Sequence, residues 1–348
     1  MTVKRQIPTF VVFFVAVAII LSGGISSQAQ VKEKPITLTY AFFAPAGTFP
    51  GKQMTHWAEE IEKRTDGLVK VKTFPGGTLL GAGDMYDGVL RGVADIGLSS
   101  PSYDPGRFPL TSGVALPVKF PNATVASLTL LDIMMEFKPA EYEPFKIITM
   151  FTGEPGHIQS RKPVKSLDDL KGMKLRAAGT GVPVLKALGA APVGMPMPQV
   201  PESVQTGVID GTMTSREVLK DFKLAELLRY VLEYPTVVVS FAAVMDKKKW
   251  DSLPDKVKKV IDELSREMAI WTGQYHDKQN VGEALAWSKR EHNLQIHTLS
   301  KTDAAKWDAL LTPMVESWKK EMGAKGLPAE KFIERLKQLR DKYTQEYK

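Results

Sequence analysis

The sequence predicts an α/β protein in which a long helix braces two groups of strands. First, its 348 residues exceed what one compact core usually needs, so two lobes or one large α/β unit are expected. Second, short β-rich runs alternate with amphipathic segments along most of the chain. Third, the stretch 254–292 lacks an internal proline after its first residue and predicts a helix of about 57 Å, longer than one small lobe.

The first group of elements occupies residues 36–151. The run 36–43 (ITLTYAFF) is a strand by its β-branched and aromatic content, and apolar residues from Met54 to Ile61 recur at helical spacing until Gly67 ends the helix. The other elements expected here are strands at 69–74 and 94–98, helices at 84–91 and 124–137, and an extended apolar segment at 145–151.

The second group begins near Gly156. It comprises strands at about 156–160, 173–177, 191–195 and 209–214, with short helices at 181–188 and 199–206. A further β run covers 236–245, and Ser252-Leu253-Pro254 then marks the start of the long helix, where a proline in the first turn is favourable. Charged amphipathic helices at 303–322 and 329–347 are expected to pack on this scaffold.

The N-terminus has the pattern of a cleavable signal peptide over residues 1–29. Lys4 and Arg5 precede an apolar run at 7–21, and Ser27-Gln28-Ala29 supplies the small residues of a cleavage site. The alternative is a retained membrane anchor, for which the run is short against the ~20 residues that span a bilayer. A chain without cysteine forms no disulfides, which suits a periplasmic protein with a large core.

Composition and motifs exclude several function classes. Without the signal peptide, 44 basic and 39 acidic residues leave a scattered net charge of +5, so no nucleic-acid surface is expected. There is no cysteine nucleophile and no G-x-S-x-G elbow, and the five histidines lack the spacing of a metal site. The glycine-containing turns lack the lysine of a phosphate loop. We therefore expect no cofactor, no metal-ligating residues and no enzymatic activity, while a metal ion that assists carboxylate binding stays an open alternative.

Arg176 is the strongest candidate for ligand binding. It lies where the predicted strand 173–177 gives way to a glycine-rich turn. A guanidinium presents a fixed fork of donors that matches a carboxylate two bonds at a time. The alternative is a structural salt bridge, for which Asp168 and Asp169 are the candidate partners.

Two segments of similar sequence predict the walls of a cleft. RGVADIGLSS (91–100) and TGVIDGTMTS (206–215) each join a helix end to a strand that finishes in small hydroxyl residues. Ligands of open α/β sheets lie beyond the carboxyl ends of strands. These two strand ends would therefore face a ligand from both sides, although similar turn chemistry alone could produce the same pattern.

Aromatic residues also end or follow predicted strands. Phe42 and Phe43 end the first strand, Phe151 ends another, and Tyr103 lies in the turn SPSYDPG. Apolar walls with a few polar anchors are typical of small-molecule pockets. They favour a monocarboxylate with an apolar or aromatic body, unless these side chains pack in the lobe cores. Tyr103 is the least suited to a core because it lies in a turn.

Several motifs together resemble one family. KPVKSLDDLKGMKLR, which ends at Arg176, is followed by LGAAPVGMP and VQTGVIDG and preceded by TDGLVKVKTFPGGTLLGAGDMYDGVLRGVADIGL. The chain resembles the DctP-type periplasmic solute-binding proteins of tripartite ATP-independent periplasmic (TRAP) transporters. The resemblance implies a two-lobe clamshell crossed by a long helix. Lobe I would comprise residues 30–153 plus about 237–275, and lobe II residues 154–236 plus about 276–348.

The resemblance also assigns ligand-binding residues. It implies that Arg176 clamps the ligand carboxylate and that Met197 lines the pocket, together with Met213 and Thr214 from the segment after Val-x-Asp-Gly. Gly156 and Thr214 occupy positions where relatives carry an arginine and an asparagine, respectively. Residues 199–205 replace a segment that is a helix with polar residues in relatives. These departures remove polar groups, so sugar acids and small dicarboxylates are not expected.

The resulting hypothesis is a monomeric periplasmic receptor that captures an organic monocarboxylate. The expected ligand-binding residues are Arg176, Phe43, Tyr103, Phe151, Met197, Met213 and Thr214. The expected partners are the small and large membrane subunits of a TRAP transporter. Two alternatives are a periplasmic sensor that feeds a membrane kinase and a binder of a dicarboxylate or a 2-oxo acid.

Overall fold

The computed structural model describes residues 1–3 and 34–347. The fold described below lies within the compact unit Pro35–Lys348. Apart from its first three residues, the predicted signal peptide 1–29 lies outside the described residues. No helix among the described residues is long and apolar enough to cross a membrane.

The first sheet has five strands in the order β2-β1-β3-β10-β4. Strands β1, β2 and β3 are mutually parallel, whereas β10 runs antiparallel to both of its neighbours. Parallel neighbours need crossover connections, which the helices between these strands supply. The strands are β1 (Ile36–Phe42), β2 (Val69–Phe74), β3 (Ile96–Ser99), β4 (Phe145–Thr152) and β10 (Ser240–Asp246).

The second sheet has six strands in the order β11-β9-β5-β8-β6-β7. Strands β8, β6 and β7 are parallel, so their carboxyl ends meet at one edge of the sheet. The strands are β5 (His157–Ser160), β6 (Lys174–Ala177), β7 (Ala191–Gly194), β8 (Gly211–Thr214), β9 (Tyr230–Leu232) and β11 (Gln295–His297). The predicted α/β architecture with two groups of strands is confirmed.

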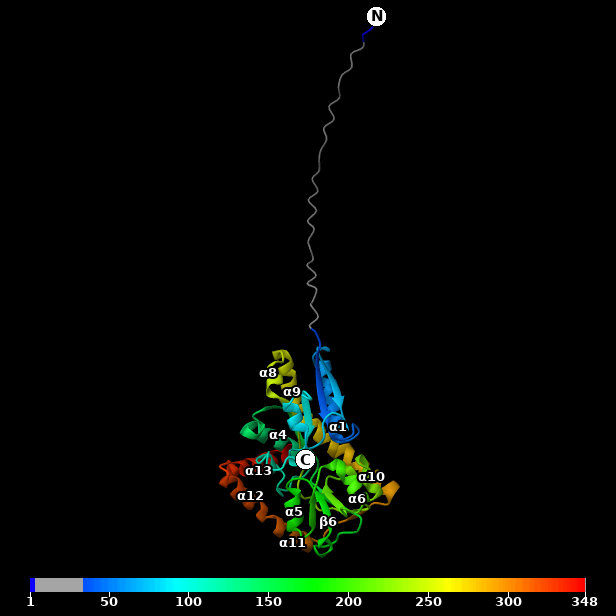
Figure 1. The fold of residues 1–348 in the computed structure, drawn as a ribbon, viewed down its shortest axis with the longest axis vertical. Helices are drawn as coiled ribbons and strands as arrows, with labels where there is room; N and C mark the ends of the chain where they lie inside the picture. Colours follow the sequence, from blue (N-terminus) through cyan, green and yellow to red (C-terminus); the bar gives the residue numbers. More distant parts are fainter. Residues whose placement is uncertain (4–33, 348) are drawn as a thin grey trace. The chain divides into compact units, whose positions relative to one another are not determined.

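Helices cover both sheets (Figure 1). Those of the first sheet and its connections are α1 (Phe49–Arg64), α2 (Met85–Leu90), α3 (Thr111–Val114), α4 (Ala123–Phe137), α8 (Lys247–Asp251) and α9 (Asp255–Tyr275). The others are α5 (Gly181–Ala187), α6 (Val200–Gln205), α7 (Val218–Asp221), α10 (Val281–His292), α11 (Lys301–Leu311), α12 (Pro313–Ala324) and α13 (Ala329–Glu346).

Two chain segments connect the sheets and run side by side. The N–H of Gly156 donates to the carbonyl of Val237 at 2.8 Å, and the N–H of Gly153 donates to the carbonyl of Val239 at 3.2 Å. The strand predicted at 236–245 is therefore confirmed only from its fifth residue onward, because its first four residues form part of this crossing. Two adjacent crossing segments are the kind of connection about which domains can rotate.

The long helix is confirmed, with one interruption. Helix α9 continues through a π-helical turn, His276–Asn280, into α10. Such turns are rare and often lie at functional sites. Gly273 packs closely on α4, since a Cβ added there would lie 2.6 Å from the Cα of Thr124.

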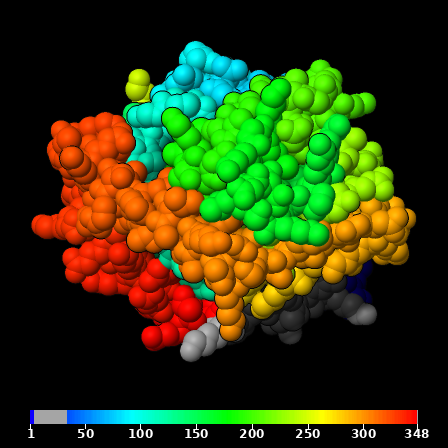
Figure 2. All heavy atoms as spheres, turned by 90° about the horizontal axis from the view of Figure 1, so that it is seen from below, coloured from blue at the N-terminus to red at the C-terminus, as the bar shows by residue number. Residues whose placement is uncertain are grey.

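The C-terminal helices differ in their packing. Trp307 and Leu311 of α11 join the apolar core of the second sheet, whereas Phe332 and Leu336 of α13 pack against α4 beside the first sheet. Figure 2 shows these helices in orange and red on one face of the molecule. The expected lobe boundaries, which place 276–348 with lobe II, stay a prediction.

A pair of alanine substitutions tests the close packing of the long helix. Gly273→Ala should lower the free energy of unfolding by about 1–3 kcal/mol, because the new methyl meets the backbone of α4. Gly282→Ala is the control, since a Cβ there meets nothing within 4 Å. It should raise stability by up to about 1 kcal/mol through helix propensity. Equal changes in the free energy of unfolding of the two variants, measured by urea denaturation, would contradict close packing at Gly273.

Candidate functional site

Arg176 lies at the third position of β6, between β8 and β7, and is only 1% exposed. Its Nε donates to the carbonyl oxygen of Met195 at 2.9 Å, and it also contacts the hydroxyl of Tyr103. Its Nη2 has no hydrogen-bond partner within the described part of the chain. Burial lowers the pKa of the guanidinium below its usual value, although arginine remains charged in proteins.

No carboxylate among the described residues pairs with Arg176. The salt bridges proposed from the sequence are absent there, because Asp169 accepts from the N–H groups of Lys165 and Ser166, and Asp168 pairs with Lys171 at 2.8 Å. A buried charge without a counter-charge is unfavourable. The arrangement therefore favours an anion that comes from outside the chain.

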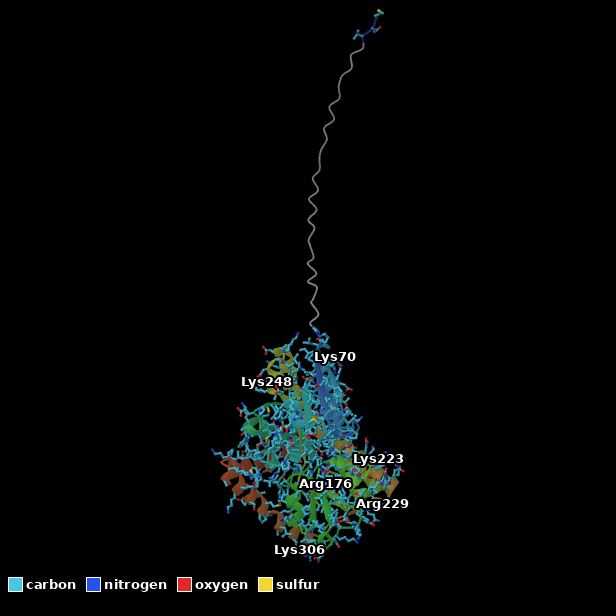
Figure 3. All side chains as sticks on the ribbon, viewed as in Figure 1. Lys70, Arg176, Lys223, Arg229, Lys248 and Lys306 are labelled. Carbon is cyan, nitrogen blue, oxygen red and sulfur yellow. The ribbon has the colours of Figure 1, made fainter. Side chains whose placement is uncertain are left out.

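Arg176 lines a small cavity of about 30 Å³ between residues of the two sheets. Figure 3 labels its position in the molecule. Of the other predicted site residues, Phe43, Tyr103, Met197 and Thr214 line this cavity. The remaining lining residues are Phe42, Ala44, Thr48, Phe49, Pro50, Ser215, Glu217, Val218, Asp221, Phe222, Val239 and Phe241.

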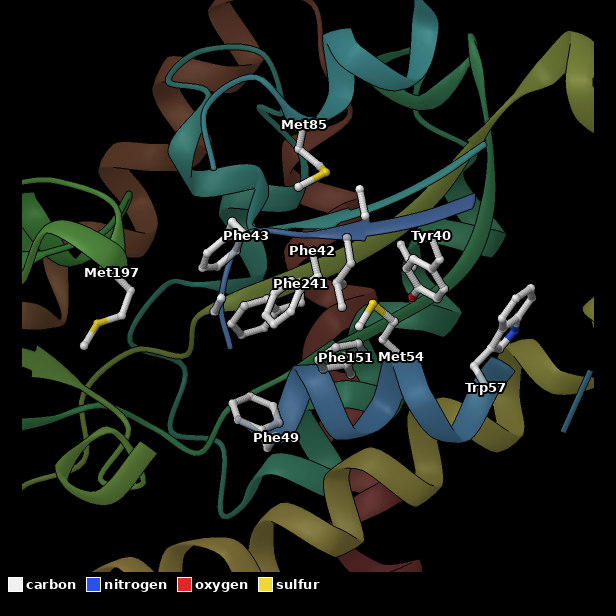
Figure 4. Close-up of a cluster of buried hydrophobic side chains, with 14 of the residues drawn as sticks. Tyr40, Phe42, Phe43, Phe49, Met54, Trp57, Met85, Phe151, Met197 and Phe241 are labelled. Carbon is white, nitrogen blue, oxygen red and sulfur yellow. The ribbon is translucent and has the colours of Figure 1, made fainter. Parts of the chain in front are cut away.

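Two predicted site residues do not line the cavity. Phe151 is fully buried and stacks on Phe241, with ring centroids 5.4 Å apart, so it supports the wall from behind (Figure 4). Met213 points into the apolar core of the second sheet, close to Gly181. Residues next to each other in a strand face opposite sides, which explains why Thr214 lines the cavity while Met213 does not.

Of the two similar segments predicted to form cleft walls, only the second places its hydroxyl residues at the small cavity. Thr214 and Ser215 line the cavity at the end of β8. At the end of β3, the hydroxyl of Ser99 instead donates to the carbonyl of Ala82, and Ser100 bonds to Ser102 at 2.6 Å. No residue of 91–100 lines the small cavity, but Tyr103, three residues further on, does.

Loops from the two sheets touch each other beside this cavity. The N–H of Met197 donates to the hydroxyl of Tyr103 at 3.2 Å, and the hydroxyl of Thr180 donates to the carbonyl of Ser112 at 3.3 Å. Gly179 approaches Ser102 so closely that an added Cβ would lie 2.6 Å from the serine Cβ. These contacts hold the two sheets' loops together over the site.

A larger cavity of about 650 Å³ adjoins the small one. Tyr103 and Val239 line both cavities. Its other walls include the turn after β6 (Gly179 and Thr180) and residues of α12 such as Trp318. It is large enough to hold a ligand of drug size and borders the small cavity in which Arg176 lies.

Two acidic side chains in the small cavity were not foreseen from the sequence. Glu217 and Asp221 flank and end helix α7, and both are buried or half-buried. Burial raises the pKa of Glu217 well above its usual range and that of Asp221 to about 6. The sequence signal was weak, because an acid at the start of a short helix is most often a surface residue.

No group of three or more histidine, aspartate or glutamate residues in the described part of the chain is arranged to hold a metal ion. The polar groups of the cavity are a guanidinium, hydroxyls and carboxyls. The geometry suits the binding of a small anion.

The fold and the site define a binding protein of two α/β lobes that enclose a small ligand. The chain belongs to the bacterial extracellular solute-binding protein family 7 (DctP), whose model matches residues 40–321. This confirms the resemblance to TRAP periplasmic solute-binding proteins. The family serves transport and is not an enzyme family.

Solved structures show the same fold. A TRAP periplasmic solute-binding protein from Desulfovibrio salexigens, solved as an open complex, is 45% identical, with a TM-score of 0.79 over 88% of this chain and 96% of that chain. One from Rhodoferax ferrireducens with copurified benzoate is 25% identical, with a TM-score of 0.85 over 89% and 99% of the two chains. One from a marine metagenome with 3-hydroxybenzoate is 30% identical, with a TM-score of 0.84 over 89% and 99%.

A curated relative binds a different class of acid. The C4-dicarboxylate-binding periplasmic protein DctP of Rhodobacter capsulatus is 24% identical over 323 residues, which cover 86% of this chain and 91% of the relative. The family therefore includes binders of mono- and dicarboxylic acids.

Thermal and urea denaturation of the ligand-free protein test how much free energy of unfolding is lost because Arg176 is buried without a counter-charge. Arg176→Met should raise the free energy of unfolding by at least about 1 kcal/mol, because it removes a buried charge that has no counter-charge. Arg216→Met is the comparison, since Arg216 is paired with Glu154 at 2.8 Å. It should cost about 3 kcal/mol. A loss of similar size in both variants would show that contacts within the protein already satisfy Arg176.

Proposed function

We propose that the protein captures an organic monocarboxylate with an apolar or aromatic body, bound through its carboxylate to Arg176. The observation that carries this proposal is the buried guanidinium, which lacks a carboxylate partner in the described chain and lines an otherwise mostly apolar cavity. A carboxylate there would accept charge-assisted hydrogen bonds in a site of low dielectric, where such bonds are strong.

The charges of the cavity favour one carboxylate over two. Among the described residues, Arg176 is the one basic residue that lines it, whereas Glu217 and Asp221 are acidic. A second carboxylate on the ligand would lie near these acids without a cation to pair with. This supports a monocarboxylate and disfavours the C4 dicarboxylates bound by the Rhodobacter relative.

The remaining walls suit an apolar body. Phe42, Phe43, Phe49 and Phe241 line the cavity, and Phe151 fixes Phe241 from behind. The relatives with benzoate and 3-hydroxybenzoate support an aromatic acid as the ligand. Together these features favour a body that buries flat apolar surface.

Capture requires the lobes to move. A cavity of about 30 Å³ holds about one water molecule, so an aromatic acid enters only when the walls separate. The relative from Desulfovibrio salexigens was solved as an open complex. A ligand that contacts both lobes stabilises their closed arrangement by its differential affinity for it. The two crossing segments between the sheets are the hinge that we propose.

We further propose the cellular setting. Residues 1–29 would export the chain to the periplasm, where it would act as a monomer. The closed, loaded protein would deliver its ligand to the small and large membrane subunits of a TRAP transporter. Closure would present the combined surface of both lobes to those subunits, so that only loaded protein delivers efficiently.

Calorimetric titration tests the role of Arg176. With benzoate, mandelate and 3-hydroxybenzoate as probes and succinate as the dicarboxylate control, at least one monocarboxylate should bind tightly. Arg176→Gln should weaken that binding at least about thirtyfold, because a desolvated ion pair loses one partner. Arg229→Gln is the matched control, since Arg229 is exposed (Figure 3). Unchanged affinity in Arg176→Gln, or tight binding of succinate alone, would refute the proposal.

A second pair of variants tests the contact between the lobes. Gly179→Ala places a methyl against Ser102, so it should lower the affinity for the best monocarboxylate about three- to tenfold. Gly189→Ala is the control, because that glycine also has a positive φ but its added Cβ meets nothing within 4 Å. Both substitutions carry similar backbone strain. Equal affinities of the two variants would mean that this contact does not contribute to closure.

A further inference from the structure

A large space lies directly beside the guanidinium of Arg176. Its Nε donates to the carbonyl oxygen of Met195 at 2.9 Å, and the guanidinium also contacts the hydroxyl of Tyr103. Met195 and Tyr103 both line the large cavity of about 650 Å³. A carboxylate held by Arg176 in the small cavity of about 30 Å³ would therefore lie next to the large one.

The two cavities meet at Tyr103 and Val239, which line both of them. Tyr103 ends the short turn after β3, and Val239 belongs to one of the two crossing segments between the sheets. The ring of Tyr103 packs edge-on against Phe43, with ring centroids 5.4 Å apart. The aromatic wall that Phe43 forms in the small cavity therefore continues through Tyr103 into the large one.

The large cavity is present while the loops of the two sheets touch each other. Both members of the hydrogen bond between Thr180 and Ser112 line it, and so do Gly179 and Ser102, which approach each other closely. Contact between the lobes therefore leaves this space open. The small cavity, by contrast, holds about one water molecule in the same arrangement.

The walls of the large cavity are mostly apolar, and most of its polar side chains are already paired. Apolar side chains that line it are Phe108, Val182, Met195, Val238, Trp318 and Met322. The polar side chains with a partner inside the chain are Ser102, Asp104, Thr111, Ser112, Thr180 and the pair Glu321–Lys325. The hydroxyl oxygen of Ser240 lacks a partner in the described chain, but it is buried within the wall. Such walls suit hydrocarbon surface better than polar groups.

We propose that the ligand is an elongated monocarboxylate, whose acid group binds Arg176 and whose apolar body passes between Tyr103 and Val239 into the large cavity. This inference rests on the proposed function and narrows its ligand class to alkanoates and arylalkanoates with a body longer than one ring. The part of the body next to the carboxylate would lie against Phe43, and the distal part would lie in the large cavity.

A neutral distal end fits the large cavity better than a second charge. Asp104 and Glu321 line it, and Lys325, its one lysine among the described residues, is paired with Glu321 at 2.8 Å. A distal carboxylate would therefore lie near acids without a free cation. Each methylene that becomes buried tightens binding by up to about fourfold, so length itself should raise the affinity.

The test compares acids that differ in length. Calorimetry would measure benzoate, phenylacetate, 3-phenylpropanoate and 4-phenylbutanoate. The longest acid should bind at least about tenfold more tightly than benzoate, because its distal ring reaches the large cavity. The alcohol 4-phenylbutan-1-ol has the same apolar body without the carboxylate. It should bind at least about thirtyfold more weakly than 4-phenylbutanoate, because Arg176 then lacks its ion pair.

Variants that fill the large cavity then locate the distal part of the ligand. Val182→Phe should reduce the preference for 4-phenylbutanoate over benzoate to less than about threefold, because the added ring takes the space of the ligand. The affinity for benzoate should stay nearly unchanged. Ala115→Phe narrows the same cavity from the other sheet and serves if Val182→Phe does not fold. Val208→Phe is the matched control, since Val208 is 51% exposed and lines neither cavity, and it should keep the full preference.

The outcomes separate this inference from the proposed function. Binding of benzoate that depends on Arg176, with equal or weaker binding of the longer acids, would overturn the inference and leave the proposed function standing. A preference for 4-phenylbutanoate that survives in both Val182→Phe and Ala115→Phe would also overturn it. If no monocarboxylate binds, or if binding ignores Arg176→Gln, both proposals are wrong.

Discussion

The site depends on a guanidinium that the fold removes from water without giving it a counter-charge. Burial of Arg176 costs free energy that the rest of the structure must supply. Two mutually parallel neighbours, β8 and β7, hold β6 in place, and the carbonyl of Met195 orients the guanidinium. In the proposed function these contacts would hold the donors in position for an anion, so that binding would need little reorganisation of them.

Hydrogen bonds beside the cavity also connect the two lobes. Asn280, in the π-helical turn of the long helix, donates to Asp221 beside the cavity, and Asp221 accepts from the N–H of Phe49 at the start of α1. One chain of hydrogen bonds thus joins the long helix, the second lobe and the first lobe. Two members of this chain, Phe49 and Asp221, also line the cavity, so the lobe closure proposed above would alter it.

The sequence predicted helices and strands best where the residues of the segment itself carry the signal. The strands at 36–43 and 145–151 and the helix at 124–137 agree with the structure to within one residue, because each is a nearly continuous apolar run that the fold buries. Residues 236–239 failed as a strand because their hydrogen bonds go to the crossing partner around Gly156. A β-like composition does not reveal which neighbour a segment will pair with.

The sequence alone determined the α/β class, the long helix and Arg176 as the anion-binding candidate, since periodicity, proline placement and a guanidinium at a strand end are local properties. Only the tertiary structure decided which side chains share the cavity with it. Tyr103 and Met197 reach it from opposite sheets, whereas Met213 and Phe151 pack behind its walls. That Glu217 lines the cavity was likewise visible only in the tertiary structure. Burial and hydrogen-bond satisfaction depend on residues distant in the chain, so a single sequence cannot display them.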